Sequence, residues 1–319
     1  MTRLRLVIGF NTIPLALAVF LLGCDAKRPD APTNRELAEP DSSVVQDSTG
    51  YRTTLRSKPL RIVSTAPSNT EILYAIGAGD RLVGVTTYCT YPPEASRCEK
   101  IGGFSPKTIS TEKIVALRPD LVLTTCGMQE AFTQSLRELG LVVLSYDAAT
   151  LDDVLCNIRL IGKVTDQSEP ADTLAERLKH RTEMVRARLA DLPKDQRPKV
   201  LLLISDSPLM TAGPTTFPGQ LIEAAGGRNL FADTEQQYPK ISEEEIVRRN
   251  PDLIVVLDKI GASVALERLR KRSGWSELPA VRNGRVYPFE DDLLSRAGPR
   301  LFDGLEQLAT ILHPTGEKP

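Results

Sequence analysis

This chain is poor in the residues from which most metal sites and nucleic-acid surfaces are built. Of its 319 residues only His180 and His313 are histidine, so a His-rich metal site is not expected. The 40 Lys and Arg residues are balanced by 41 Asp and Glu residues, and the net charge of −1 argues against a nucleic-acid partner. Five cysteines are too few for a scaffold built on disulfides.

Familiar catalytic motifs are also lacking. The sequence contains no Gly-x-Ser-x-Gly, no phosphate loop ending in Gly-Lys-Ser/Thr, no His-Glu-x-x-His and no Cys-x-x-Cys. Gly77-Ala78-Gly79 matches part of a dinucleotide fingerprint, but it ends a predicted helix instead of following a strand, and position 82 is Leu. These absences favour a binding protein over an enzyme, and they give no reason to expect a cofactor.

The chain does contain a ten-residue segment that occurs twice. Residues 112–121 and 244–253 are identical at six of ten positions, and each copy continues into an apolar run. Each copy starts with glutamate, Glu112 or Glu244, whose charge suits a helix N-terminus. The proline of each copy then ends the helix, and Pro-Asp turns the chain into a buried strand. The repeat predicts two similar α/β lobes, with a ligand cleft between them.

The N-terminal residues have the pattern of a targeting segment. Arg3 and Arg5 precede a mostly apolar run from Leu6 to Leu22. Leu21-Leu22-Gly23-Cys24 resembles the lipobox of bacterial lipoproteins, in which the signal is cut before the cysteine and the cysteine is lipidated. An uncleaved transmembrane anchor is the alternative, but polar residues and a proline make the run marginal for spanning a bilayer.

The rest of the chain divides by composition and periodicity. We expect a signal peptide over 1–23, a flexible tether over 24–57, an N-terminal α/β lobe over 58–165, a bridging helix over 166–193 and a C-terminal α/β lobe over 194–319. The tether is rich in Pro, Asp and Ser and lacks periodic apolar positions. In both lobes predicted strands alternate with predicted helices, which indicates parallel sheets with helices on their faces. The fold class is therefore α/β, with two Rossmann-like lobes.

Two local features add expectations. Ser68 and Glu71 have the spacing of a capping box and predict a helix that begins after Ser68 and ends at Gly77. Cys89 and Cys98 share one loop of a protein whose N-terminal segment predicts export, so either a disulfide or two free thiols is consistent with the sequence.

Four segments together resemble the periplasmic substrate-binding proteins of ABC importers for cobalamin, ferric siderophores and haem. They are Arg61-Ile-Val-Ser-Thr-Ala-Pro-Ser-Asn-Thr-Glu-Ile-Leu, the stretch from Gly79 to Glu94, Ile101-Gly-Gly-Phe104, and Arg296-Ala-Gly-Pro-Arg-Leu. Within that family, Tyr88-x-x-Tyr-Pro-Pro is most similar to the cobalamin-binding branch. The resemblance implies two lobes joined by one long helix, which agrees with the predicted 166–193 segment.

The resemblance also implies a set of site residues. Tyr88, Phe104 and Tyr238 stand where the family places aromatic side chains in the cleft, Arg296 stands where a polar group faces it, and Tyr91 is a further candidate. Aromatic faces suit a flat ligand such as a corrin or porphyrin ring. The cobalamin binder of enteric bacteria has tryptophans where this chain has Phe and Tyr, so the resemblance leaves the exact ligand open.

The partners follow from the same resemblance. Glu112 and Glu244 stand where the family places glutamates that pair with arginines of the membrane permease, although stabilisation of a helix N-terminus explains them equally well. We expect a monomer that is anchored to a bacterial membrane in the periplasm or at the cell surface, and that passes its ligand to a permease and ATPase complex. The first alternative is a protein of the same fold with a ferric siderophore or haem as cargo. The second is an enzyme such as a metal chelatase.

Overall fold

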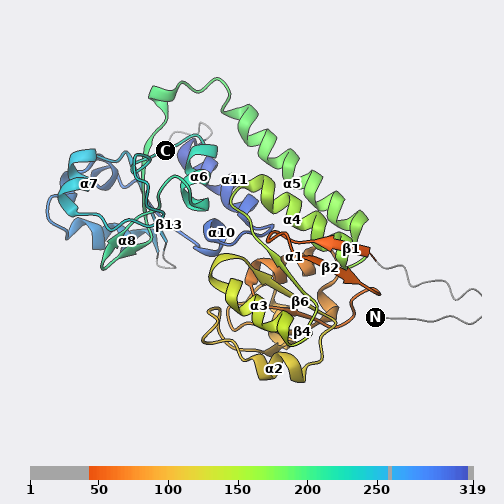
Figure 1. The fold of residues 1–319 in the computed structure, drawn as a ribbon. Coiled ribbons are helices and arrows are strands. Elements are labelled where there is room, and N and C mark those ends of the chain that lie inside the picture. The colour runs from red at the N-terminus through yellow and green to blue at the C-terminus, as the bar shows by residue number, and fades with distance from the viewer. Residues whose placement is uncertain (1–42, 258–260, 315–319) are drawn as a thin grey trace, which may run out of the picture. The chain divides into compact units, whose positions relative to one another are not determined.

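The computed structural model describes residues 43–257 and 261–314 and contains two parallel sheets (Figure 1). The first sheet has five strands in the order β5-β4-β3-β6-β7, and every neighbouring pair is parallel. Its strands are β3 Ile62–Ser64, β4 Leu82–Val85, β5 Glu99–Lys100, β6 Leu121–Thr125 and β7 Val143–Tyr146. The α/β fold class with two parallel sheets is as predicted.

The second sheet has four strands in the order β11-β8-β12-β13, again all parallel. Its strands are β8 Lys199–Leu203, β11 Arg228–Asn229, β12 Leu253–Leu257 and β13 Val286–Phe289. Two antiparallel hairpins lie outside the sheets, β1 Ser43–Gln46 with β2 Arg52–Leu55, and β9 Ser205–Asp206 with β10 Leu209–Met210.

Helices connect the strands, as parallel pairing requires. Those of the first lobe are α1 Pro67–Ala75, α2 Thr111–Ala116, α3 Glu130–Glu138 and α4 Leu151–Val164. The long helix α5 spans Ser168–Arg188 and lies against α4 (Figure 1). The helices after it are α6 Phe217–Ala224, α7 Glu243–Arg249, α8 Ala262–Arg270, α9 Pro279–Arg282, α10 Asp292–Ser295 and α11 Leu301–Leu312.

Both sheets are buried on both faces, and the strands alternate between two layers of core. In β6, Leu121 and Leu123 belong to one cluster while Val122 belongs to another. In β12, Leu253 and Val255 join the same cluster as Leu121. This shared cluster also takes in α4, α5 and α11, so one continuous core connects the two lobes.

The repeated segment forms the same unit twice. Ser110 and Ser242 cap α2 and α7 by accepting the N–H of the residue three positions on. The residue before each proline, Arg118 or Asn250, has a left-handed φ of 46° or 52°, which ends the helix. The aspartate after each proline accepts a backbone N–H at the start of the neighbouring strand, from Arg61 at 2.9 Å and from Lys199 at 2.8 Å.

The first helix differs from its prediction. α1 begins at Pro67, with Ala66 as its N-cap and no side-chain cap, because proline's fixed φ suits the first helical turn. Ser68 therefore lies inside the helix, and the predicted capping box with Glu71 is wrong. Gly77 does follow the helix in the left-handed conformation, with a φ of 81°.

The long helix is shorter than the predicted 166–193 segment. Asp166 has a left-handed φ of 53°, so the helix begins only at Ser168, and it ends at Arg188, before Pro193. Its buried side chains are Ala171, Leu174, Ala175, Leu178, Thr182 and Val185.

The predicted tether is partly folded. Residues 43–55 form the β1–β2 hairpin, which is held by a buried ion pair between Asp47 and Arg137 of α3. A contact between partners so far apart in sequence leaves no periodic pattern in the hairpin itself. Residues 24–42 of the tether, the apolar run from Leu6 and the proposed lipidation site Cys24 lie outside the described residues. Among the helices of 43–257 and 261–314, none combines the length and hydropathy needed to cross a bilayer.

Candidate functional site

A cavity of about 910 Å³ lies at the carboxyl ends of the strands. The loops that follow β3, β4, β5, β6 and β7 all contribute to it, as do the loops before α6 and α7 and the segment after β13. The carboxyl edge of an open parallel sheet is where α/β folds bind ligands. The lining residues are Ala66, Pro67, Ser68, Tyr88, Phe104, Ser105, Thr108, Thr125, Cys126, Met128, Asp147, Ala148, Phe217, Gln237, Tyr238, Asp291, Asp292, Ser295, Arg296 and Ala297.

Three of the predicted aromatic residues meet in this cavity. Tyr88 and Phe104 come from the first lobe and Tyr238 from the second. Tyr88 is 57% exposed and Tyr238 46%, so their rings are available to a ligand. Burial raises the pKa of the Tyr238 phenol, with a smaller contribution from Asp291, so the group stays neutral at physiological pH.

Hydrogen bonds hold the backbone of the segments that carry two of these rings. On either side of Tyr238, the carbonyl of Gln237 accepts the N–H of Gly213 at 2.7 Å and the carbonyl of Pro239 accepts that of Thr211 at 3.2 Å. The carbonyl of Phe104 accepts Nε2 of the buried Gln129 at 2.9 Å. The backbone of these two segments is therefore preorganised, which lowers the entropy cost of ordering them around a ligand.

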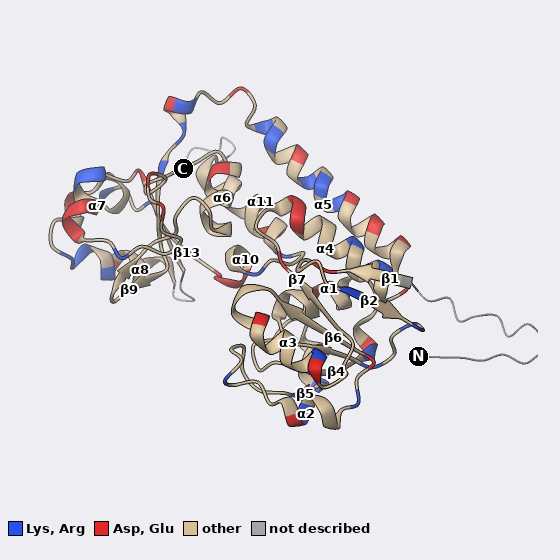
Figure 2. Ribbon diagram, in the orientation of Figure 1, with Lys and Arg blue, Asp and Glu red and all other residues tan. Residues whose placement is uncertain are grey.

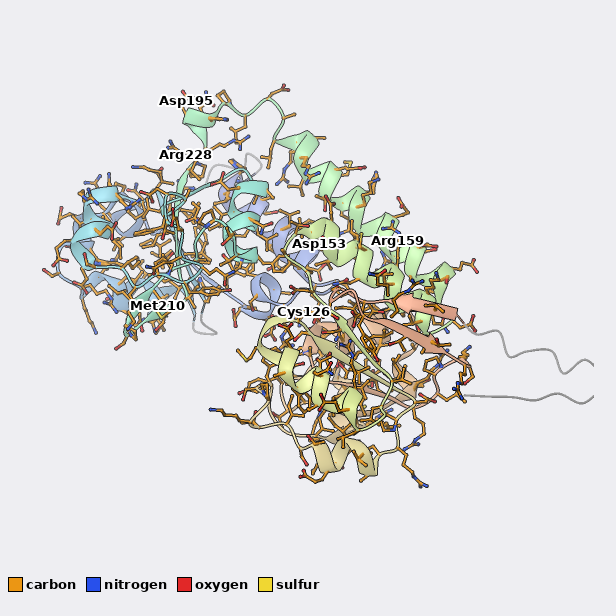
Figure 3. The ribbon with its side chains drawn as sticks, in the orientation of Figure 1. Cys126, Asp153, Arg159, Asp195, Met210 and Arg228 are labelled. Atoms are coloured by element: carbon orange, nitrogen blue, oxygen red, sulfur yellow. The ribbon has the colours of Figure 1, made fainter. Side chains whose placement is uncertain are left out.

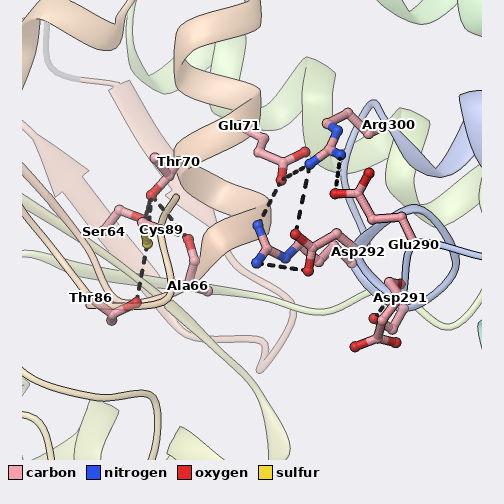
Figure 4. Close-up of polar contacts among 12 residues, drawn as sticks. Ser64, Ala66, Thr70, Glu71, Thr86, Cys89, Glu290, Asp291, Asp292 and Arg300 are labelled. Atoms are coloured by element: carbon pink, nitrogen blue, oxygen red, sulfur yellow. Dashed lines mark hydrogen bonds and ion pairs between the residues drawn. The ribbon is translucent and has the colours of Figure 1, made fainter. Parts of the chain in front are cut away.

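Arg296 also lines the cavity, but its guanidinium already has partners. Nη1 lies 3.3 Å from Oε1 of Glu71 in α1, and Nη2 lies 2.8 Å from Oδ1 of Asp292. Arg300 approaches the same Glu71 oxygen at 3.6 Å and pairs with Glu290 at 3.0 Å (Figure 4). This cluster joins α1 of the first lobe to the segment after β13 of the second.

Glu71 is the buried member of that cluster. Its side chain is 2% exposed, and Oε2 has no hydrogen-bond partner. Burial raises the pKa of the Glu71 carboxyl to about 7, although the charges of Arg300 and Arg296 act in the opposite direction. The Glu71 carboxyl is therefore half ionised near neutral pH, and it lies between the lobes in contact with Arg296.

Tyr91 does not line the cavity, in contrast to the expectation for it. It lines a separate cavity of about 340 Å³ with Glu71, Tyr74 and Arg177 among others. The guanidinium of Arg300 lies 4.3 Å from the centre of its ring, so a cation–π contact occupies that face.

Several lining residues were missed by the sequence reasoning. Cys126 follows β6 directly, and Asp147 follows β7 directly (Figure 3 labels Cys126). The rule that ligands bind at the carboxyl ends of parallel strands would have identified both. Burial raises the pKa of the Cys126 thiol, so this group is a neutral thiol at pH 7. Met128, Asp291 and Asp292 gave no comparable signal.

Glu112 and Glu244 lie on exposed first turns of α2 and α7, where Figure 2 shows acidic residues. Each glutamate's own backbone N–H and the preceding cap serine hold its carboxyl pKa below the usual range. Both side chains therefore stay ionised well below neutral pH. A groove beside Glu244 is lined by Glu243, Val247, Arg248, Ser273 and Gly274.

Cys89 and Cys98 are free thiols in the structure. The hydroxyl of Thr70 donates to Sγ of Cys89 at 3.2 Å, and Sγ of Cys98 donates to the carbonyl of Leu82 at 3.4 Å. Among the described residues, no group of three or more His, Cys, Asp and Glu side chains is arranged to hold a metal ion.

Known proteins share this architecture along most of the chain. An uncharacterised ABC transporter substrate-binding lipoprotein of Bacillus subtilis is 34% identical over 307 residues, which cover 94% of this chain and 95% of the relative. A vitamin B12-binding protein of Vibrio cholerae is 33% identical over 263 residues, 81% of this chain and 92% of the relative. A solved structure of the periplasmic vitamin B12-binding protein of Vibrio cholerae superposes on this chain with a TM-score of 0.69 at 32% identity. The match covers 80% of this chain and 96% of the solved one.

A second solved structure, a periplasmic heme-binding protein from Roseiflexus sp. RS-1, has a TM-score of 0.68 at 30% identity and covers 79% of this chain and 97% of that one. Residues 62–293 match the family described as periplasmic binding protein. Together with the fold and the interlobe cavity, these matches show that the chain belongs to the periplasmic binding protein family.

Proposed function

We propose that this chain is the solute-binding component of an ABC importer and that it captures a corrinoid such as cobalamin in its cavity. The relatives named above are transport proteins, which supports a binding role without catalysis. Two of the similar proteins bind vitamin B12 or heme, so a flat macrocycle is the ligand class that we infer.

The charge of the cavity wall is the observation that favours a corrinoid. Aromatic faces from both lobes are joined by three carboxylates, Asp147, Asp291 and Asp292, whereas Arg296 is the one cation among the described lining residues. Because Arg296 is already paired with Glu71 and Asp292, little positive charge remains for an anionic ligand. A corrin ring carries peripheral amides, which donate hydrogen bonds to carboxylates.

Haem is the second candidate, and a separate observation supports it. Tyr88 is exposed in the cavity, and a tyrosine phenol is a known axial ligand of haem iron. The carboxylates oppose this assignment, since haem propionates would face Asp147 and Asp291 without a free arginine. An anionic ferric siderophore meets the same difficulty.

Delivery to the permease is the second part of the proposal. Glu112 and Glu244 occupy equivalent positions in the two repeats, are exposed and stay ionised. We infer that they pair with arginines of the permease, one from each lobe. Lipidated Cys24 would keep the protein at the membrane surface, which agrees with the description of the Bacillus subtilis relative as a lipoprotein.

Calorimetric titration of the purified chain with cyanocobalamin, haem and a ferric hydroxamate tests the proposal. We expect one-to-one binding of cyanocobalamin and weaker binding of the other two. Tight binding of haem with none of cyanocobalamin would move the protein to iron acquisition while keeping the transport role. Binding of none of the three would overturn the proposed ligand class.

A further inference from the structure

A second cavity lies beside the first, and Met128 lines both. It has a volume of about 710 Å³ and lies between the hairpin turn and the start of α3. Its lining residues are Thr49, Gly50, Tyr51, Gly127, Met128, Glu130, Ala131, Thr133, Gln134 and Arg137. We refer to it as the hairpin groove.

The hairpin wall of this groove is firmly fixed. The carboxylate of Asp47 accepts the N–H groups of Thr49 at 2.9 Å, Tyr51 at 3.1 Å and Ser145 at 2.9 Å, and it forms the buried ion pair with Arg137. Ser145 belongs to β7, so the hairpin is attached to the carboxyl end of the sheet, where the main cavity lies. Tyr51 is therefore presented by a rigid wall and not by a loose segment.

Three contacts place the groove next to the main cavity. Met128 lines both. Cys126 lines the main cavity and the next residue, Gly127, lines the groove. Asp147 lines the main cavity, and its N–H donates at 3.1 Å to the hydroxyl of Ser48, the residue before Thr49. The two cavities are therefore neighbours, and a part of the ligand that projects beyond the main cavity past Met128 would reach the groove.

The groove has the chemistry of an aromatic subsite. Tyr51 is 45% exposed. The guanidinium of Arg137 lies 3.8 Å from the centre of its ring and occupies one face, so the opposite face is the one open to a ligand. Met128, 64% exposed, supplies a polarisable thioether to the same groove. Thr49 and Gln134 add hydrogen-bonding groups. A rigid aromatic face, a thioether and polar side chains suit a planar heteroaromatic ring with polar edges.

We propose that the hairpin groove is a second subsite of the ligand site, and that it takes the heteroaromatic base of the nucleotide appended to a complete corrinoid. The corrin ring would occupy the main cavity while the base stacks on Tyr51. This inference rests on the proposed function, because it assumes that a corrinoid is the ligand.

Two corrinoids, one with and one without the appended nucleotide, test the subsite. Cyanocobalamin carries the nucleotide, whose base is the lower axial ligand of its cobalt, whereas dicyanocobinamide lacks the nucleotide and has a second cyanide in that position. We expect the native chain to bind cyanocobalamin about three- to tenfold more tightly than dicyanocobinamide, the range typical of one aromatic stacking contact. Tyr51→Ala is expected to bring the ratio of the two affinities close to one, and Tyr51→Phe, which retains the ring, is expected to preserve it.

The controls separate the subsite from the hairpin's structural role and from the ligand assignment. Tyr51→Leu keeps apolar bulk beneath Arg137 but removes the flat ring, so it is expected to lose the preference while thermal denaturation stays near native. Met184→Ala, an exposed methionine on α5 outside both cavities, is expected to leave the ratio unchanged. Equal affinity of the native chain for both corrinoids, or an unaltered ratio in Tyr51→Ala, would overturn the subsite alone. Binding of neither corrinoid would overturn the proposed ligand and the subsite with it.

Discussion

Oε1 of Glu71 lies 3.3 Å from Nη1 of Arg296, and this pair connects the first helix of one lobe to the cavity wall of the other. The two residues are 225 positions apart in the sequence. The pair is buried, and the second oxygen of Glu71 is unpartnered, so desolvation of the carboxylate is only partly offset by the two arginines. A carboxylate in such a position makes the stability of the protein depend on pH.

Glu71 is expected to lower the stability of the folded chain as pH rises. The Glu71 carboxyl has a pKa of about 7 in the folded protein, against the usual 4.5 in an unfolded chain. The protonated Glu71 carboxyl therefore contributes its full stabilisation of the folded state below pH 4.5, and this stabilisation is lost as the pH rises through 7. At about 1.4 kcal/mol per pKa unit, the loss is about 3 kcal/mol of unfolding free energy. Relative to the native chain, Glu71→Gln should gain that amount between pH 4.5 and 7.5 in urea denaturation.

Glu306 provides the matched control for this measurement. Its hydrogen bond with Arg181 holds its carboxyl pKa below the usual range, so its contribution is present at neutral pH and lost on acidification. Glu306→Gln should therefore show the opposite trend, losing stability relative to the native chain as pH rises. A difference between Glu71→Gln and the native chain that does not vary with pH would show that Glu71 titrates normally.

Truncation of the cavity aromatics should weaken ligand binding without unfolding the protein. Tyr88→Ala and Tyr238→Ala each remove an exposed ring, so each is expected to raise the Kd for the macrocyclic ligand roughly tenfold, or about 1.4 kcal/mol. Calorimetry gives the affinities and circular dichroism checks the fold. Tyr91→Ala is the contrast, since Tyr91 lines a different cavity, and its Kd should stay near the native value. Native affinity in both Tyr88→Ala and Tyr238→Ala would show that the cavity is not the ligand site.

The repeated segment could be predicted because its structure is set by neighbouring residues. The glutamate, the proline and the apolar run lie within a few positions of one another, and each restricts the backbone locally. The buried strand expected after each copy is β6 or β12, which begin at Leu121 and Leu253. The aromatic residues of the cavity were located through a family resemblance, and the carboxyl edge of the sheets brings them together.

The remaining features depend on contacts that a local pattern does not contain. Glu71 was assigned to a capping box because Ser68 stands three residues earlier, whereas its burial depends on Arg296 and Arg300 at the far end of the chain. The hairpin was assigned to a tether because its residues are polar, whereas it folds through Asp47 and Arg137, 90 positions apart. In both cases a charged residue is buried by a partner from a distant segment.

The hairpin is expected to depend on its buried ion pair. Asp47→Ala leaves Arg137 without its partner and removes the acceptor for three backbone N–H groups, so it should cost about 3–5 kcal/mol of unfolding free energy and expose the N–H of Ser145 to hydrogen exchange. Lys58→Ala removes an ion pair with Asp166 that is largely exposed, and should cost far less than Asp47→Ala. Equal losses in the two variants would contradict the structural role of the hairpin.

Membrane attachment should depend on one cysteine. If the segment ending in Cys24 is a lipobox, Cys24→Ala abolishes lipidation, and the protein should move from the membrane fraction to the soluble or secreted fraction, or stay unprocessed. Incorporation of labelled palmitate measures the modification directly. Cys156→Ala changes an exposed cysteine of α4 and should leave both readouts unchanged. Palmitate incorporation that persists in Cys24→Ala would show that the anchor lies elsewhere.

Reversal of the two repeat glutamates should separate transport from binding. Glu112→Arg combined with Glu244→Arg places positive charge on both first turns, where it would repel the permease arginines that we propose as partners, so ligand uptake by cells should fall at least tenfold. Both side chains are exposed and lie outside the cavity, so the Kd of the purified variant should match that of the native chain. Glu138→Arg on α3 makes the same substitution once, at an exposed helical position outside the repeats, and should leave uptake intact. Normal uptake by the double variant would assign both glutamates to helix stabilisation alone, whereas loss of uptake in all the variants would point to net charge and not to docking.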